Sequence, residues 1–308
     1  MDVKAFYDNF TNTLTYVVYD PESRDAVVID PVLNYDPAAS STDTKSVDEV
    51  VRFVEQQGLR VHYIMETHAH ADHLSGSQAM KKAFPQARIA IGANITKVQE
   101  VFKQAFDLPE DFQPDGHQFD RLLNEGETLK AGTVAVKVLF TPGHTPACAT
   151  YMIDDMLFTG DALFMPDFGT GRCDFPAGSA RDLYHSIKGK LYALPDSTRV
   201  FVGHDYQPGG RELRYETTIG ESKRSNVQLP AERGEEEFVK FRTERDKTLS
   251  APKLLFQSVQ VNIDAGRLPE SGRNEVRYLK VPINLFRPKT DEAGLPVGTV
   301  TEESVQRT

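Results

Sequence analysis

The sequence predicts a protein of the α/β class with metal-binding loops at the ends of its strands. Two observations predict the class. Short apolar runs typical of strands alternate with stretches of helical periodicity, and 308 residues are enough to bury a large core. A third observation predicts the loops, because clusters of His and Asp directly follow several of the strand-like runs.

The expected elements follow from local patterns in chain order. Apolar runs predict strands over residues 14–19, 26–29, 61–65, 87–91 and 134–139. A helix over 46–57 follows a lead rich in Ser and Asp, and it ends at Gly58, a residue type common just after a helix. A second helix is predicted over 181–193 from apolar residues at helical spacing: Leu183, Ile187 and Leu191.

One segment of seven residues carries the strongest chemical pattern in the chain. It directly follows the strand-like run 61–65, and its ligand-type side chains are His68, His70, Asp72 and His73. Imidazole and carboxylate together suit zinc, iron or manganese, and the lack of Cys argues against a Cys-rich structural zinc site. Unrelated surface or core histidines are a poor alternative, since the whole chain has eight His. The segment therefore predicts a metal-dependent enzyme.

Three later segments repeat the order of strand, glycine and ligand. His144 follows a Pro-Gly turn, Asp161 follows Gly160, and His204 follows Gly203. Each side chain is therefore expected in a loop at a strand end, where functional residues concentrate. Any one of these three segments would be weak evidence alone. Together with the His-rich segment they make four ligand-bearing segments in this order, which indicates a composite metal site.

In order and spacing, these motifs resemble the metallo-β-lactamase superfamily over roughly residues 10–210. The resemblance implies an α/β fold of the αββα sandwich type, with two mixed β-sheets face to face, helices on both outer faces and the metal in a groove at one edge. We expect a catalytic domain over 1–210 and a helical extension with a tail over 211–308, packed on that domain.

Within the superfamily, the segment after Asp161 resembles the persulfide dioxygenase family. Residues 169–175 match its Gly-x-Gly-Arg-x-Asp-Phe stretch, and 204–206 match its His-Asp-Tyr, where glyoxalase II usually has His-Glu-Tyr. Residues 242–247 and 254–258 are similar to the longer bacterial subgroup of these dioxygenases. Two departures concern the substrate pocket: Thr170 stands where the animal enzymes have Cys, and the spacing from Asp161 to the Arg is longer.

This resemblance implies oxidation of glutathione persulfide by O2 to sulfite and glutathione, a step of sulfide detoxification. One Fe(II) per chain would be held by a catalytic triad that leaves coordination positions open: His68, His144 and Asp161. Four further residues would orient these ligands or hold a second metal: His70, Asp72, His73 and His204. The alternative is a hydrolase similar to glyoxalase II, with two zinc ions that activate water against acyl-glutathione. The ligand inventory alone does not separate the two.

Glutathione carries two carboxylates, so a cleft that binds it should present cations and hydrogen-bond donors. The candidates are Arg172 first, then Tyr206, Arg214, Lys223 and Arg224. The alternative for the arginines is ordinary surface charge, and for Arg172 it is a brace of its own loop through Asp174. Cys173 is expected to be a small structural residue.

Composition limits the other partners and the location. A net charge of −10 disfavours nucleic acid. Cys148 and Cys173 cannot form a disulfide framework and suggest a reducing compartment. We see neither a signal peptide nor an apolar stretch of membrane-spanning length, so a cytoplasmic location is expected. A homo-oligomer remains open.

The C-terminal region differs from the rest in character. Residues 232–247 are dense in charge, with Phe238 and Phe241 as apolar anchors, and predict an exposed helix on the main domain. Residues 253–265 are more amphipathic and could pack closely. From Arg287 onward we expect a loosely held tail.

Overall fold

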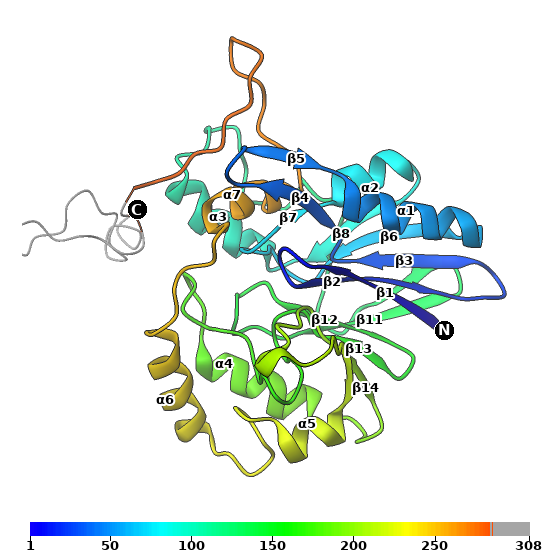
Figure 1. Cartoon of the computed structure of the whole chain (residues 1–308), viewed down its shortest axis with the longest axis vertical. Coiled ribbons are helices and arrows are strands. Elements are labelled where there is room, and N and C mark those ends of the chain that lie inside the picture. Colours follow the sequence, from blue (N-terminus) through cyan, green and yellow to red (C-terminus); the bar gives the residue numbers. More distant parts are fainter. Residues whose placement is uncertain (284, 286–308) are drawn as a thin grey trace, which may run out of the picture.

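Two six-stranded sheets pack face to face in the computed structural model, which describes residues 1–283 and 285 (Figure 1). From one edge to the other, the first sheet contains β1 (Asp2–Asp8), β2 (Thr13–Tyr19), β3 (Asp25–Ile29), β6 (Arg60–Glu66), β8 (Arg88–Gly92) and β9 (Arg121–Leu123). The strands from β3 to β9 run parallel, whereas β1 and β2 pair antiparallel. The carboxyl ends of β3 and β6 therefore lie at one edge.

The second sheet contains β10 (Thr128–Ala131), β11 (Val134–Phe140), β12 (Ala149–Ile153), β13 (Met156–Phe158), β14 (Arg199–Phe201) and β15 (Glu216–Thr218). β11 and β13 are both antiparallel to β12, and β14 is parallel to β13. Three strands thus point the same way, and the loops that follow β11, β13 and β14 start from one edge of this sheet.

A small third sheet supports the loop after β6. Its strands are β5 (Ser41–Asp43), β4 (Val32–Asp36) and β7 (Leu74–Ser75), in that order. β7 directly follows the His-rich segment, and it pairs with β4 through Val32 opposite Ser75. The His-rich segment is therefore held between two strands, β6 at its start and β7 at its end.

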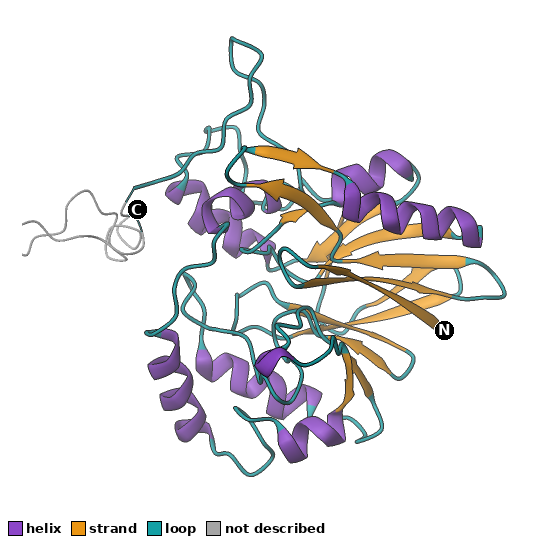
Figure 2. Ribbon diagram, viewed as in Figure 1, coloured by secondary structure: helices purple, strands orange, loops and turns teal. Residues whose placement is uncertain are grey.

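Helices cover the outer faces of the sandwich (Figure 2). On the first sheet these are α1 (Lys45–Gln57), α2 (Ser77–Ala83) and α3 (Ile95–Ala105). On the second they are α4 (Ala180–His185), α5 (Ile219–Ser225) and α6 (Glu235–Asp246), and α7 (Leu255–Asn262) lies near the edge where the ligand loops meet. The predicted αββα sandwich is confirmed.

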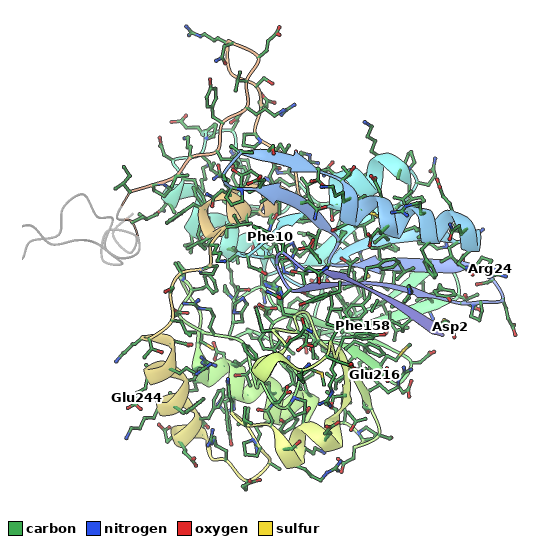
Figure 3. The ribbon with its side chains drawn as sticks, viewed as in Figure 1. Asp2, Phe10, Arg24, Phe158, Glu216 and Glu244 are labelled. Atoms are coloured by element: carbon green, nitrogen blue, oxygen red, sulfur yellow. The ribbon has the colours of Figure 1, made fainter. Side chains whose placement is uncertain are left out.

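The core between the sheets follows the alternation of side chains along each strand. Tyr16 and Val18 of β2 point into it, while Val17 points to the helices outside. Tyr16 packs edge-to-face on Phe158, which lies between the two sheets (Figure 3). The Tyr151 hydroxyl donates a hydrogen bond of 2.6 Å to the carbonyl oxygen of Glu66 and so links β12 of the second sheet to β6 of the first.

Most predicted elements are confirmed, including the five strands and the helix over 46–57, after which Gly58 has a left-handed conformation with φ 61°. The predicted helix over 181–193 begins as α4 but continues as a π-helical turn, Ser186–Leu191. Its apolar residues are buried as expected: Leu183, Ile187 and Leu191.

The C-terminal region is joined to the sandwich more closely than the charge pattern indicates. The expected domain boundary at residue 210 falls before β15, a strand that pairs with β14 of the second sheet. On α6, Phe238 is buried and Glu244 is exposed (Figure 3), but Arg242 and Asp246 are buried as well. The tail expected from Arg287 lies outside the described residues. Within those residues no helix combines the length and the apolar character needed to cross a membrane.

Candidate metal centre

The loops after β6, β11, β13 and β14 meet at one edge of the sandwich because these strands end there. They bring together all seven ligand-type residues singled out in the sequence: His68, His70, Asp72, His73, His144, Asp161 and His204. Asp72 is partly exposed and the other six are buried. First and second sheets both contribute, so the centre spans the two layers.

Two glycines allow the backbone around Asp161 to pack this closely. Gly160 has φ 48°, and a Cβ there would lie 2.5 Å from the Thr67 hydroxyl oxygen. A Cβ on Gly171 would lie 1.9 Å from the carbonyl oxygen of Asp161. Both distances are far below van der Waals contact, so only glycine fits at either position.

The three residues predicted to hold iron form one compact group. The Asp161 Oδ2 atom lies 3.5 Å from His144 Nε2 and 3.9 Å from His68 Nε2, and one ligand atom from each of the three lies within 4.8 Å of the others. Among the described residues, His68 Nε2 and Asp161 Oδ1 have no hydrogen-bond partner although both are buried. Buried polar atoms without partners are costly, and a bound cation would satisfy them, so the group fits a metal ion.

Hydrogen bonds to the Nδ1 atoms of His68 and His144 fix the orientation of the two imidazole rings. His144 Nδ1 lies 2.7 Å from the carbonyl oxygen of Arg172, which can only accept, so this nitrogen carries the proton. His68 Nδ1 lies 3.0 Å from the Thr67 hydroxyl, which itself donates to Asp30. In both rings Nε2 is therefore the nitrogen free to bind a metal. Burial, together with the neighbouring His70, lowers the pKa of His68, which also favours its neutral, ligating form.

His70 has a different environment from His68. Its Nε2 atom lies 3.1 Å from Asp30 Oδ1 and 3.5 Å from Glu66 Oε2, and all three residues are buried. Burial opposes a charged imidazole, but Asp30 and then Glu66 outweigh it and raise the pKa of His70. Neither carboxylate was predicted from the sequence, although Asp30 follows β3 and Glu66 ends β6 at the same edge. Their position at strand ends was the available sign.

The remaining ligand-type residues lie beside the triad. His204 Nε2 is 3.3 Å from Asp161 Oδ1 and 3.4 Å from Asp72 Oδ2. Burial opposes its charged form, yet Asp72 and Asp161 raise the pKa of His204 to about 9. Burial, with His70 adding to it, lowers the pKa of His73 to about 4. Buried polar atoms without hydrogen-bond partners within the described part of the chain also occur on five other residues of the centre: Glu66, His70, Asp72, His73 and His204.

A cavity of about 260 Å³ opens over Asp72 and over His144 and Asp161 of the triad. Arg172 and Tyr206, two of the predicted substrate residues, line it, but Arg214 is not among its described lining residues. The Arg214 guanidinium lies 3.5 Å from Glu221, and Lys223 pairs with Asp196 instead. Other lining residues come from distant parts of the chain: Phe10 to Asn12, Phe175 and Pro252 to Leu254. Phe175 and Leu254 belong to stretches singled out in the sequence, whereas no local motif marks Phe10 to Asn12.

Arg172 braces its own loop, which is the alternative to substrate binding that was considered for it from the sequence. Its Nε and Nη2 atoms donate to both carboxylate oxygens of Asp174 at 2.6 and 2.7 Å, and Nη1 donates to the carbonyl oxygen of Ser250. The guanidinium also lies over the ring of Phe175, 5.6 Å from its centroid. The side chain is 17 % exposed, so it remains in reach of the cavity.

The same loop is tied to α6 by a buried ion pair. Arg242 donates to Asp246 Oδ1 at 2.9 and 2.5 Å, and Asp246 Oδ2 accepts a hydrogen bond of 2.9 Å from the Cys173 backbone N–H. Arg242 also donates to the Gln228 side chain, which accepts a hydrogen bond from the hydroxyl of Thr170. Burial raises the pKa of the Cys173 thiol, with the Asp246 charge adding to it, as suits a structural residue.

The comparisons with known proteins agree on the family. A family model described as "Metallo-beta-lactamase superfamily" matches residues 8–204. The chain is 46% identical to a "Probable metallo-hydrolase" of Burkholderia pseudomallei, over 92% of this chain and 99% of that protein. It is 42% identical to "Glyoxylase B2" of Dictyostelium discoideum, over 92% and 98%.

Two further likenesses concern proteins named for another activity. The chain is 31% identical to the human mitochondrial "Persulfide dioxygenase ETHE1", over 86% of this chain and 88% of that protein. Among solved structures, ETHE1 from Myxococcus xanthus has a TM-score of 0.69 and 31% identity, and covers 87% of this chain and 100% of its own.

Proposed function

The chain belongs to the metallo-β-lactamase superfamily, and on that premise we propose that it is a persulfide dioxygenase that oxidises glutathione persulfide with O2 to sulfite and glutathione. A single Fe(II) would be held by His68, His144 and Asp161. The observation that carries the proposal is that these three face one another beside the cavity, whereas His70 faces Asp30 and Glu66. We place the reaction in the cytoplasm, as the cysteine usage suggests.

The donor set supports iron. Two imidazoles and one carboxylate would leave several coordination positions of a bound iron ion open, as the donor set of non-haem iron oxygenases does. Burial disfavours the charged form of Asp161, but the charge of His204 beside it outweighs burial and lowers the pKa of Asp161, which favours the ionised carboxylate. Iron, when bound, would supply redox chemistry with O2 that the side chains lack.

The residues around the cavity would bind and orient the substrate. Arg172 keeps N–H groups beyond its three hydrogen bonds, and it would meet a carboxylate of the glutathione moiety. Phe175 packs edge-on against His144 with 5.0 Å between ring centroids, and Tyr206 stacks near His204 at 5.5 Å. These rings would exclude water from the reacting sulfur. The likeness to ETHE1 proteins at 31% identity supports this assignment.

The alternative is a thioester hydrolase that acts on acyl-glutathione with two zinc ions. Two observations favour it: Asp72, His73 and His204 offer buried atoms without partners, and the relatives at 46% and 42% identity are named for hydrolase and glyoxalase activity. Bound zinc would lower the pKa of water to about 7. Against it, the carboxylates beside His70 compete for an imidazole that a binuclear site would use.

Metal analysis combined with two activity assays tests the proposal. The protein would be purified without oxygen and then loaded with iron or zinc. We expect about one iron per chain, and O2 consumption on glutathione persulfide with the iron form alone. Two zinc ions per chain, together with hydrolysis of S-lactoylglutathione and no O2 consumption in the iron form, would overturn it in favour of the hydrolase.

A further inference from the structure

A buried asparagine at the end of α7 contacts the loop that carries four of the ligand-type residues. The Asn262 Nδ2 atom donates to the carbonyl oxygens of His70 and His73, both at 2.8 Å. Its Oδ1 atom accepts a hydrogen bond of 2.8 Å from the Ser75 backbone N–H. Asn262 is 4 % exposed, so these bonds form away from water.

The amide suits this position because the loop offers two acceptors and one donor to it. An asparagine side chain has two N–H donors and a carbonyl oxygen, so one side chain satisfies all three backbone groups. Unpaired buried backbone groups are costly, and the His-rich segment has no regular secondary structure between β6 and β7. Asn262 therefore provides pairing that the segment cannot supply itself.

The end of α7 is itself fixed to the first sheet's helices. The side chain of Gln99 on α3 donates to the carbonyl oxygen of Ile263, and that of Gln78 on α2 donates to the carbonyl oxygen of Ala265. Val259 and Ile263 are buried in the core under the same helices. Asn262 is thus held on a rigid support rather than on a free chain end.

We infer that α7 is part of the metal centre, and that Asn262 is a positioning residue that sets the place of the loop from His68 to His73. The metal ligands of this loop depend on a residue nearly two hundred positions later in the chain. The inference concerns metal affinity, so it holds whether the reaction is persulfide oxidation or thioester hydrolysis, and its failure is separate from failure of the proposed function.

Asn262→Asp tests the inference with a nearly isosteric change. The carboxylate can still accept from Ser75, but it loses both donors and sets negative charge against two carbonyl oxygens. We expect the affinity of the full-length protein for Co(II), measured by chelator competition and the visible absorption of the bound ion, to fall about 10–100-fold. The midpoint of thermal unfolding without metal should fall no further than in the control.

Gln118→Glu is the matched control. Gln118 is a buried amide that accepts a hydrogen bond from the Gln99 side chain and donates one to the carbonyl oxygen of Gln113, and within the described residues it makes no hydrogen bond to α7 or to the ligand loops. Co(II) affinity should remain near that of the unchanged protein. Equal losses in both variants, or an unchanged affinity in Asn262→Asp, would overturn the inference.

A measurement on the unchanged protein keeps the test decisive if the variant does not fold. Coupling between two sites is reciprocal, so a helix that favours metal binding must itself be stabilised by the metal. We expect Co(II) to slow amide hydrogen exchange in residues 255–266 as well as in 67–76. No change in the exchange of 255–266 on metal binding would refute the role of α7.

Discussion

The two sides of the metal centre show how a repeated residue type acquires different roles. On the open side, His68 faces His144 and Asp161, which come from the second sheet. On the closed side, His70 faces Asp30 and Glu66, which both come from strand ends of the first sheet. The two histidines are neighbours in the motif, and their ring centroids are 4.0 Å apart. What differs is the layer that supplies their partners.

This difference explains why the motif alone does not define a metal count. An imidazole beside a carboxylate at the cavity is ready to bind a cation, whereas His70, whose Nε2 atom lies 3.1 and 3.5 Å from two buried carboxylates, has its charge balanced by protein. Buried atoms without hydrogen-bond partners occur on both sides among the described residues, so the charge balance of the imidazole is what distinguishes the closed side from the open one. Each prediction below would break or sharpen this contrast.

The largest effect is expected from Asp161→Ala on the open side. Three protein ligands leave no redundancy, so metal and activity should both be lost to below detection. His70→Ala on the closed side is the matched change, and it should retain metal with an affinity weakened by about 10–100-fold at most. Metal content by elemental analysis measures both. Near-normal iron in Asp161→Ala would break the contrast.

His204→Ala should have a smaller effect, because His204 contacts the open side through Asp161 and is not one of its three ligands in the proposal. We expect most of the iron to remain and activity to fall about 10–100-fold. Iron per chain and the rate of O2 consumption are the two measurements. Complete loss of metal would instead make His204 a ligand and favour the hydrolase with two metals.

Arg172→Ala tests whether the residue next to the open side binds substrate or only braces its loop. Its carbonyl oxygen, which holds His144, is unchanged by the substitution. Loss of one charge-assisted hydrogen bond of about 1.5–3 kcal/mol predicts a decrease in kcat/KM of roughly one to two decades, mainly through KM. Arg172→Lys is the control for charge without the planar geometry and should recover little. An unchanged KM with a lowered unfolding temperature would assign the residue to its contact with Asp174 alone.

The smallest effect is expected from thiol alkylation, because chemistry at the open side needs no cysteine. Burial raises the pKa of the Cys148 thiol to about 12 and also raises that of Cys173. Alkylation requires the thiolate, so both should be unreactive in the folded protein. Iodoacetamide at pH 8 should leave activity unchanged, with mass spectrometry as the check that no label is present. Loss of activity in proportion to labelling would instead indicate that a cysteine thiol takes part in the reaction.

Much of the fold and of the ligand set could be predicted because both depend on local patterns. Apolar runs marked the strands, and glycine followed by His or Asp marked the strand ends. The environment of His70 could not be predicted, since it depends on which strand ends become neighbours in the sheet. The same holds for Asn262, whose partners are distant in sequence, and for the burial of Arg242, which depends on its contact with Thr170.

The candidate substrate residues show the same limit. Arg172 was assigned to the cavity from its loop, and the structure places it there. Arg214 was proposed as a substrate-binding residue for its charge alone. A surface charge can instead form an ion pair with any acidic residue that the fold places nearby, as Arg214 does with Glu221. Lining residues such as Phe10 and Lys253 come from opposite ends of the chain, so only tertiary structure reveals them.

The glycines beside Asp161 bear on how this centre can change in evolution. A ligand such as His144 can be exchanged for another ligating side chain without moving the backbone, so metal preference can change by single substitutions. Any substitution of Gly171 collides with a carbonyl oxygen, and no compensating change in a side chain can remove that clash. The metal ligands can therefore change during evolution while the backbone conformation at Gly160 and Gly171 stays the same.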